Sequence, residues 1–170
     1  MNKRTILAAV VAAVLALAAC ASALAADDTE VISIRFVAGA VSISVAPSDW
    51  DITGVMPNSQ YTTPADHFTI RNSGYWSVTT KIRAADATGD MGASWTLSPA
   101  AVPGPDRYGL LYTTNGTDYD PITPSQVNFI PLTSGASQTF GLRALTPTNS
   151  GCIQPSEVVT TTITISAYRT

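Results

Sequence analysis

The chain has 170 residues, a mass of 17.7 kDa and a formal charge of −3, with 9 Lys and Arg against 12 Asp and Glu. This length holds one domain or two small ones, and the acidic balance excludes the basic face of a nucleic-acid-binding protein. One His and two Cys cannot supply the four ligands of a zinc module. Only 12% of the residues are charged and 45% are apolar, so the chain can form a hydrophobic core.

The N-terminus has the three parts of a secretory signal peptide. Lys3 and Arg4 precede an apolar run of about fourteen residues, which is too short to span a membrane. Residues 23–25 (Ala-Leu-Ala) then supply a cleavage site of small residues. We therefore expect a signal peptide over residues 1–25 and a single domain over residues 26–170. The mature protein should be secreted or held at the cell surface, with no membrane span.

A second cleavage signal overlaps the first. Cys20 follows Leu-Ala-Ala, which resembles the lipobox of bacterial lipoproteins, where the Cys becomes the lipidated N-terminus. This alternative predicts a lipid-anchored surface protein. If Cys20 is removed with the signal peptide, Cys152 has no partner within the chain. Cys152 is then either a buried thiol or one half of a bond between two molecules.

Beyond residue 26, apolar and polar residues alternate with period two, and no window shows the spacing of an amphipathic helix. Strands are predicted over residues 31–36, 41–45, 68–71, 78–83, 95–97, 108–112, 127–132, 140–144 and 159–167. With Pro- and Gly-rich loops between them, they predict an all-β fold, an Ig-like antiparallel β-sandwich of about 7–9 strands. The nearly continuous apolar run 127–132 predicts a strand buried on both faces.

The inward positions of this alternation predict the core. Trp95, between Ser94 and Thr96, is expected to anchor it. The full set is Ile34, Phe36, Val41, Ile43, Phe68, Ile70, Val78, Ile82, Trp95, Leu110, Phe140, Leu142, Ile163 and Ile165. At Ala38-Gly39 the phase of the alternation flips, which predicts a tight hairpin or a strand that changes sheets.

Two motifs lie at strand ends. Asn72-Ser73-Gly74 closes one predicted strand, and Leu132-Thr133-Ser134-Gly135-Ala136-Ser137 precedes another. An N-x-G turn followed by L-x-x-G-x-S resembles the extracellular Ig-like modules of bacterial and archaeal surface proteins. Gly74 is expected to take a positive φ, and Ser137 to hydrogen-bond back to its loop. The resemblance implies a surface-layer, adhesin, fibre or spacer module, and it carries over no catalytic residue.

Catalytic residues are few. His67 is the only His, so any Ser-His-Asp or Cys-His arrangement must use it, and no G-x-S-x-G motif supplies a nucleophile. Carboxylates that could pair for sugar hydrolysis have no sequence context that would raise a pKa; they are Asp49, Asp51, Asp66, Asp118 and Asp120. We expect no enzymatic activity, and a small secreted hydrolase is the weakest alternative.

Calcium is the one cofactor for which the sequence offers a candidate. Asp118 and Asp120, beside Asn115-Gly116-Thr117, present hard oxygen ligands in a turn. Their spacing does not match the calcium-binding D-x-[DN]-x-[DN]-G loop. Side chains that merely shape a turn remain the alternative.

The adjacent Tyr75 and Trp76 are candidates for binding a sugar ring. In an extended chain they point to opposite faces, so one is expected in the core and the other exposed. An exposed ring would suit a polysaccharide-binding or adhesin module, and core packing is the alternative.

These observations favour a secreted, non-enzymatic structural or interaction protein, such as a fibre or matrix subunit. The strand-rich ends suggest self-association, because unpaired strand edges offer free N–H and C=O groups. Residues 27–37, attached through Ala38-Gly39, can close their own sheet or be donated to a neighbouring copy. A carbohydrate-binding or adhesin module and a surface lipoprotein are the alternatives.

Overall fold

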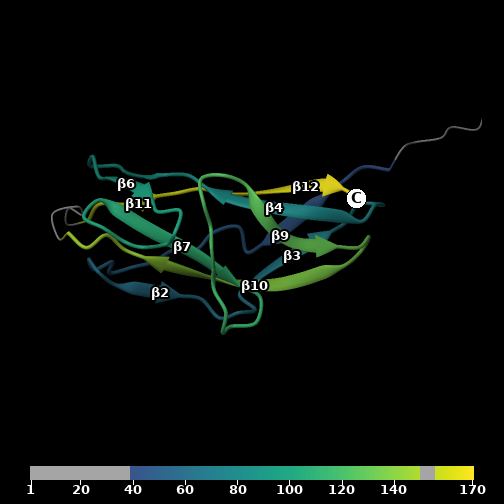
Figure 1. Cartoon of the computed structure of the whole chain (residues 1–170), viewed down its shortest axis with the longest axis horizontal. Coiled ribbons are helices and arrows are strands. Elements are labelled where there is room, and N and C mark those ends of the chain that lie inside the picture. Colours follow the sequence, from purple (N-terminus) through teal and green to yellow (C-terminus); the bar gives the residue numbers. More distant parts are fainter. Residues whose placement is uncertain (1–38, 150–155) are drawn as a thin grey trace, which may run out of the picture. The chain divides into compact units, whose positions relative to one another are not determined.

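The computed structural model describes residues 39–149 and 156–170, which lie in one compact unit, Ala38–Thr170 (Figure 1). These residues form strands and loops and no helix, which confirms the all-β prediction. A helix that could span a membrane is accordingly not found in this described part. The predicted signal peptide 1–25 with Cys20, the predicted strand 31–36 and Cys152 lie outside the described residues.

Twelve strands follow one another in the described chain. They are β1 (Ile43–Ala46), β2 (Gln60–Thr62), β3 (Phe68–Asn72), β4 (Val78–Ala84), β5 (Ala87–Gly89), β6 (Ser94–Leu97), β7 (Arg107–Thr113), β8 (Asp120–Pro121), β9 (Val127–Leu132), β10 (Ser137–Leu145), β11 (Val159–Thr160) and β12 (Ile163–Arg169). The strands predicted from alternation within the described residues are all present, and the one predicted over residues 31–36 lies outside them. The three that were not predicted, β2, β5 and β8, have only two or three residues each, too few to show a period.

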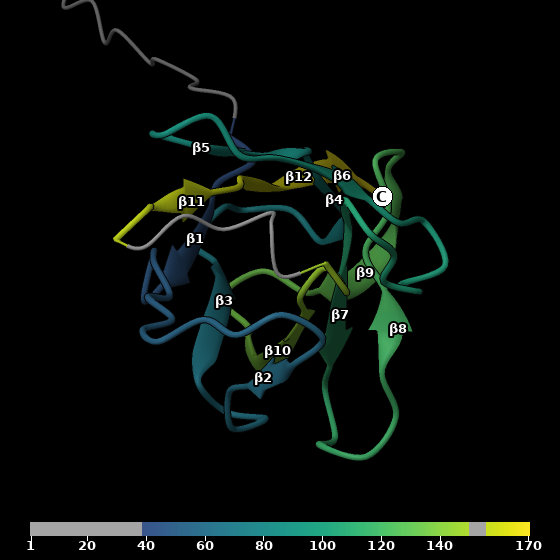
Figure 2. The same cartoon turned by 90° about the vertical axis from the view of Figure 1, so that its left-hand side faces the viewer.

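The strands form two sheets. The larger has the order β1-β3-β10-β7-β6-β5-β11, with β2 also paired to β10 and β8 to β7. The smaller has the order β12-β4-β9. All pairs are antiparallel except β6 with β7. Figure 2 shows β3, β10 and β7 on one side of the core and β12, β4 and β9 on the other.

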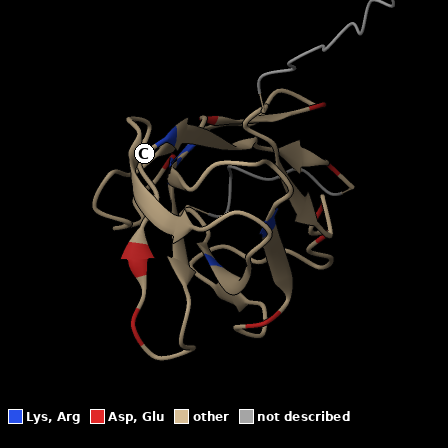
Figure 3. Cartoon of the chain, turned by 90° about the vertical axis from the view of Figure 1, so that its right-hand side faces the viewer, with Lys and Arg blue, Asp and Glu red and all other residues tan. Residues whose placement is uncertain are grey.

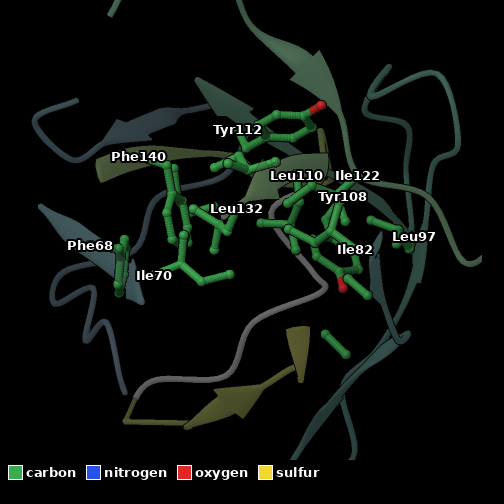
Figure 4. Packing of buried hydrophobic residues seen from close by; sticks show 14 of the residues in the cluster. Phe68, Ile70, Ile82, Leu97, Tyr108, Leu110, Tyr112, Ile122, Leu132 and Phe140 are labelled. Atoms are coloured by element: carbon green, nitrogen blue, oxygen red, sulfur yellow. The ribbon is translucent and has the colours of Figure 1, made fainter. Parts of the chain in front are cut away.

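One core fills the space between the sheets (Figure 4). The larger sheet contributes Phe68 and Phe140, whose rings stack with centroids 5.2 Å apart, and the smaller contributes Ile82 from β4. Eight predicted core residues are buried as expected: Phe68, Ile70, Val78, Ile82, Trp95, Leu110, Phe140 and Leu142. Ile43, Ile163 and Ile165 pack against this core but are only half-buried, and Ile34 and Phe36 lie outside the described residues.

Two predictions about burial are wrong. Val41 precedes β1 and is 40% exposed, because pairing with β3 starts only at Ile43. Strand β9 is not buried on both faces: Asn128 and Pro131 are exposed on the outer face of the smaller sheet, as Thr79 and Arg83 of the central strand β4 are. β9 is also an edge strand, which pairs only with β4 in its sheet. Pro131 has no N–H to donate, which an edge strand tolerates.

The single strand predicted over residues 159–167 is in fact two. β11 pairs with β5 in the larger sheet, whereas β12 pairs with β4 in the smaller one. The crossing at Thr161 is fixed by the Tyr108 hydroxyl, which donates to the Ala85 carbonyl and lies 2.7 Å from Thr161 Oγ1. Burial raises the pKa of Tyr108 to about 12, against a smaller lowering by the bond to Thr161.

Candidate functional site

The residues considered for catalysis are exposed at the surface. His67 is exposed in the turn before β3, where its ring meets Phe68 edge-on at 4.6 Å. The five candidate aspartates are also exposed: Asp49, Asp51, Asp66, Asp118 and Asp120. Over residues 39–149 and 156–170, no three His, Cys, Asp or Glu residues come together in a group that could hold a metal. The geometry therefore offers no argument for acid–base or metal chemistry in this part.

The loop that holds the calcium candidates is a turn organised by Asn115. Its Oδ1 accepts hydrogen bonds from the N–H groups of Thr117 and Asp118, both at 2.9 Å, and its Nδ2 donates to Asp118 Oδ2 at 2.7 Å. Asp120 lies in β8 opposite Tyr112, whose pKa is raised mainly by burial and further by the charge of Asp120. One carboxylate oxygen of Asp118 thus accepts a hydrogen bond within the turn, a contact of the kind by which Asp and Asn side chains shape turns.

A shallow, open hollow of about 460 Å³ lies along the β5–β11 edge. It is lined by Thr88, Gly89, Asp90, Val158 and Thr160. Its one carboxylate, Asp90, already accepts a hydrogen bond from the Val158 N–H at 2.9 Å.

Tyr75 and Trp76 do not divide between core and surface as expected. Tyr75 is 80% exposed and Trp76 38%, because both lie in the turn between β3 and β4 and not in a strand. The Arg169 guanidinium lies 3.6 Å from the centroid of the Trp76 ring, and Trp76 Nε1 donates to the Gly39 carbonyl at 3.1 Å. One face of Trp76 is therefore covered, and Tyr75 is the freer of the two rings.

The two sequence motifs meet around Asn72, which is fully buried. Its Nδ2 donates to the carbonyls of Trp76 at 2.8 Å, Thr133 at 3.1 Å and Leu132 at 3.3 Å. Its Oδ1 accepts from the Gly74 N–H at 3.0 Å. This amide joins the end of β3, in the larger sheet, to the β9–β10 connection that leaves the smaller one.

The details of these motifs differ from the prediction. Gly135, at φ 76°, has the positive φ that was expected of Gly74. Gly74 is required for a different reason: a Cβ there would lie 2.6 Å from the Ala40 carbonyl oxygen. The Ser134 hydroxyl donates to the Gly74 carbonyl at 2.8 Å, so it bonds to the other motif and not back to its own loop.

The longest edge strand in the described part is β12; β1, at the edge of the larger sheet, also carries no Pro or charge but has only four residues. In its sheet β12 pairs only with β4, over all seven of its residues. It carries no Pro and no charged residue before Arg169 at its end (Figure 3). β9, the opposite edge of the same sheet, contains Pro131. Charges and Pro are the usual protection of an edge against pairing with another chain, and β12 lacks both along most of its length.

Core-facing side chains of β12 are also incompletely covered. Ile165 lies opposite Ile82, which is fully buried, and Ala167 lies opposite the buried Thr80, yet both β12 residues are half-exposed. On this flank, therefore, the backbone edge of β12 has no further strand in its sheet, and the core-facing side chains of the same strand are partly exposed. Sequence reasoning placed Ile163 and Ile165 in the core but could not identify the strand as an edge, because sheet order is not a local property.

Comparison of the chain with protein-family models gave no match, and comparison with curated proteins gave none either. The β12 edge and the exposed Tyr75 and Trp76 are the features of the described residues that bear on function.

Proposed function

We propose that this chain is a secreted, non-enzymatic structural subunit with an Ig-like β-sandwich fold, which associates with copies of itself in a fibre or matrix at the cell surface. The observation that carries the proposal is the edge of β12: seven residues long, uncharged before Arg169, and open beside half-covered apolar side chains. Such an edge is a template for pairing with a further strand. The signal-like N-terminus and the low charge of the chain agree with it.

Electron microscopy and sedimentation of the exported protein test the proposal. Filaments or large assemblies are the expected result, and particles that remain monomeric at all concentrations would refute self-association. N-terminal sequencing of the same material tests the export step. A start at Ala26 is expected, whereas a blocked, lipid-modified Cys20 would replace secretion by the lipoprotein alternative.

A pair of variants tests whether the β12 edge is responsible. Thr164→Lys adds a charge to β12, and Asn128→Lys adds the same charge to the Pro131-containing edge β9. Both positions lie beside a basic residue of β4, since Thr164 pairs with Arg83 and Asn128 with Lys81. The repulsion between like charges is thereby matched. Assembly should fall at least tenfold with Thr164→Lys and remain near wild type with Asn128→Lys.

A polysaccharide-binding or adhesin module is the second candidate, favoured by the exposure of Tyr75. A pull-down with cell-surface polysaccharides that succeeds with the wild type and fails with Tyr75→Ala would support it. Retention that is equal for the two proteins would count against it.

A further inference from the structure

The core of the described unit is open along one flank, which we name the open seam. It is formed by the half-buried, core-facing side chains of two edge strands: Ile43 and Val45 of β1, and Ile163, Ile165 and Ala167 of β12. The core-facing side chains of the neighbouring strands are covered. Ile70 of β3, opposite Val45, and Ile82 of β4, opposite Ile165, are both fully buried. Among the described residues, therefore, no strand covers the core at the seam.

The connections between strands place β1 and β12 on the same flank. Short loops join β9 to β10 and β3 to β4. Across the sandwich, β9 of the smaller sheet therefore faces β10 of the larger sheet, and β4 faces β3. Continuing outward past β3 leads to β1 in the larger sheet, and continuing past β4 leads to β12 in the smaller sheet. The seam between these two strands therefore runs along the side that faces away from the β9–β10 connection.

The chain itself contains a segment that matches the seam in chemistry and length. Residues 31–37 alternate, with Ile32, Ile34 and Phe36 on one side of an extended chain. Three apolar residues of the segment would thus meet three core-facing residues of β12. The segment has seven residues, as many as β12, and ends just before Gly39.

The way the described chain begins argues against insertion of this segment into its own seam. Residues 39–42 lead into β1 without a turn or bend. They are held on the β3–β4 turn, where the Gly39 carbonyl accepts from Trp76 Nε1 and the Ser42 carbonyl from the N–H groups of Ser73 and Gly74. To enter its own seam, the preceding chain would have to reverse its direction immediately before Gly39.

Strand direction also distinguishes a segment that fills the seam of its own chain from a segment that comes from another molecule. β12 ends at Arg169, which stacks on Trp76, and the chain enters at Gly39, which is bonded to the same Trp76. A segment that fills its own seam and ends at Gly39 would therefore run parallel to β12. A segment from another molecule is free to pair antiparallel, the slightly more stable arrangement.

We propose that the open seam is the acceptor for residues 31–37 of a second copy of this chain, which pair with β12 and place Ile32, Ile34 and Phe36 in the core. The inference deepens the proposed self-association by naming the donor segment and the acceptor edge. Each molecule has one donor segment and one seam, so the contact is head-to-tail and continues into a filament unless it closes in a ring.

Cysteine cross-linking of the full exported chain tests the proposal, in a background with Cys20 and Cys152 replaced by Ser. Donor variants carry one Cys in place of Ile32, Ile34 or Phe36, which allows for different registers. The acceptor variant is Ile165→Cys, on the seam side of β12. The control acceptor is Ser166→Cys, whose side chain lies with Lys81 on the opposite face. Donor and acceptor proteins are mixed and oxidised, and cross-linked dimers are quantified on a denaturing gel.

At least one donor is expected to cross-link to Ile165→Cys at least fivefold more than to Ser166→Cys. Double variants with donor and acceptor in one chain should form ladders of oligomers. Double variants that give only internally cross-linked monomers would show that the segment fills its own seam. If no donor cross-links to Ile165→Cys while the wild type still forms assemblies in the microscope, the seam is not the acceptor, and the proposed self-association stands. If the wild type stays monomeric as well, both fail.

Discussion

Replacement of Asn72 by Ala is the sharpest test of how the two sheets are held together. The Asn72 side chain is fully buried and bonds with both ends of its amide: Nδ2 with the carbonyls of Trp76, Thr133 and Leu132, and Oδ1 with the Gly74 N–H. Truncation to Ala removes all of these bonds at once and leaves their partners beside a small void.

The expected loss of stability follows from the bonds that the amide itself makes. The Trp76 carbonyl lies at the surface turn and can bond to water, the Gly74 N–H still donates to the Ser42 carbonyl, and the Thr133 carbonyl still accepts from the Ala136 N–H. The two N–H protons and the accepting oxygen of the amide make the equivalent of about three hydrogen bonds, each contributing about 0.5–1.5 kcal/mol. Their loss gives about 3 kcal/mol for Asn72→Ala, a large part of the roughly 5–15 kcal/mol by which domains are stable.

Urea unfolding followed by Trp fluorescence measures this loss. With a slope of about 2 kcal/mol per M for a domain of this size, the midpoint should fall by about 1.5 M. The control is Asn128→Ala, whose side chain is exposed on β9 and which should change stability by less than about 0.5 kcal/mol. Midpoints should be compared at two protein concentrations, so that assembly does not contribute.

Asn72→Asp gives an independent check through pH. It keeps an acceptor for the Gly74 N–H but sets a carboxylate oxygen against the carbonyls that Nδ2 faced, which raises the pKa of the new Asp above its unfolded value. Its stability relative to wild type should therefore fall as pH rises from 4 to 7. The reasoning is refuted if Asn72→Ala unfolds within about 1 kcal/mol of Asn128→Ala and Asn72→Asp shows no such pH dependence.

Three further variants probe other contacts. The pKa of Tyr108, about 12 in the folded state, exceeds the unfolded value of 10.0, so the unfolded chain loses its proton first. Stability should drop by roughly 1–2 kcal/mol between pH 10 and 12 after allowance for solvent screening, and chemical unfolding of Tyr108→Phe should show a smaller drop. Thr80 bridges the irregular register of β4 and β9 by donating to the Ile130 carbonyl (2.5 Å) and accepting from its N–H (3.0 Å). Thr80→Val should cost about 2 kcal/mol in urea, and Thr79→Val on the exposed face should cost under 0.5. At Gly135 a Cβ meets nothing within 4 Å but φ is 76°, so Gly135→Ala should cost about 1 kcal/mol and Gly135→Asn less; equal melting temperatures would contradict backbone strain as the cause.

Strand edges show why the proposed assembly surface could not be predicted residue by residue. The apolar run 127–132 predicted a strand buried on both faces, but one face of β9 is exposed and the strand lies at the edge of its sheet. The alternation at 159–167 predicted one strand, but the chain crosses between sheets at Thr161, under the Tyr108 hydroxyl. Which neighbour a strand pairs with depends on contacts between residues far apart in the chain, and local periodicity carries no information about them.

The sequence by itself determined the all-β class, most of the strands and the centre of the core. Alternation with period two places Ile70 and Ile82 inward whichever strands they adjoin, because apolar side chains leave water on one face of a pleated strand. It also singled out Asn72-Ser73-Gly74 and the Leu132–Ser137 stretch as a related pair. Only the tertiary structure decided that they meet through one buried amide, and that β12 is an open edge of its sheet. The physical reason is that hydrogen bonds between sheets and the coverage of an edge are set by the order in which distant strands pack.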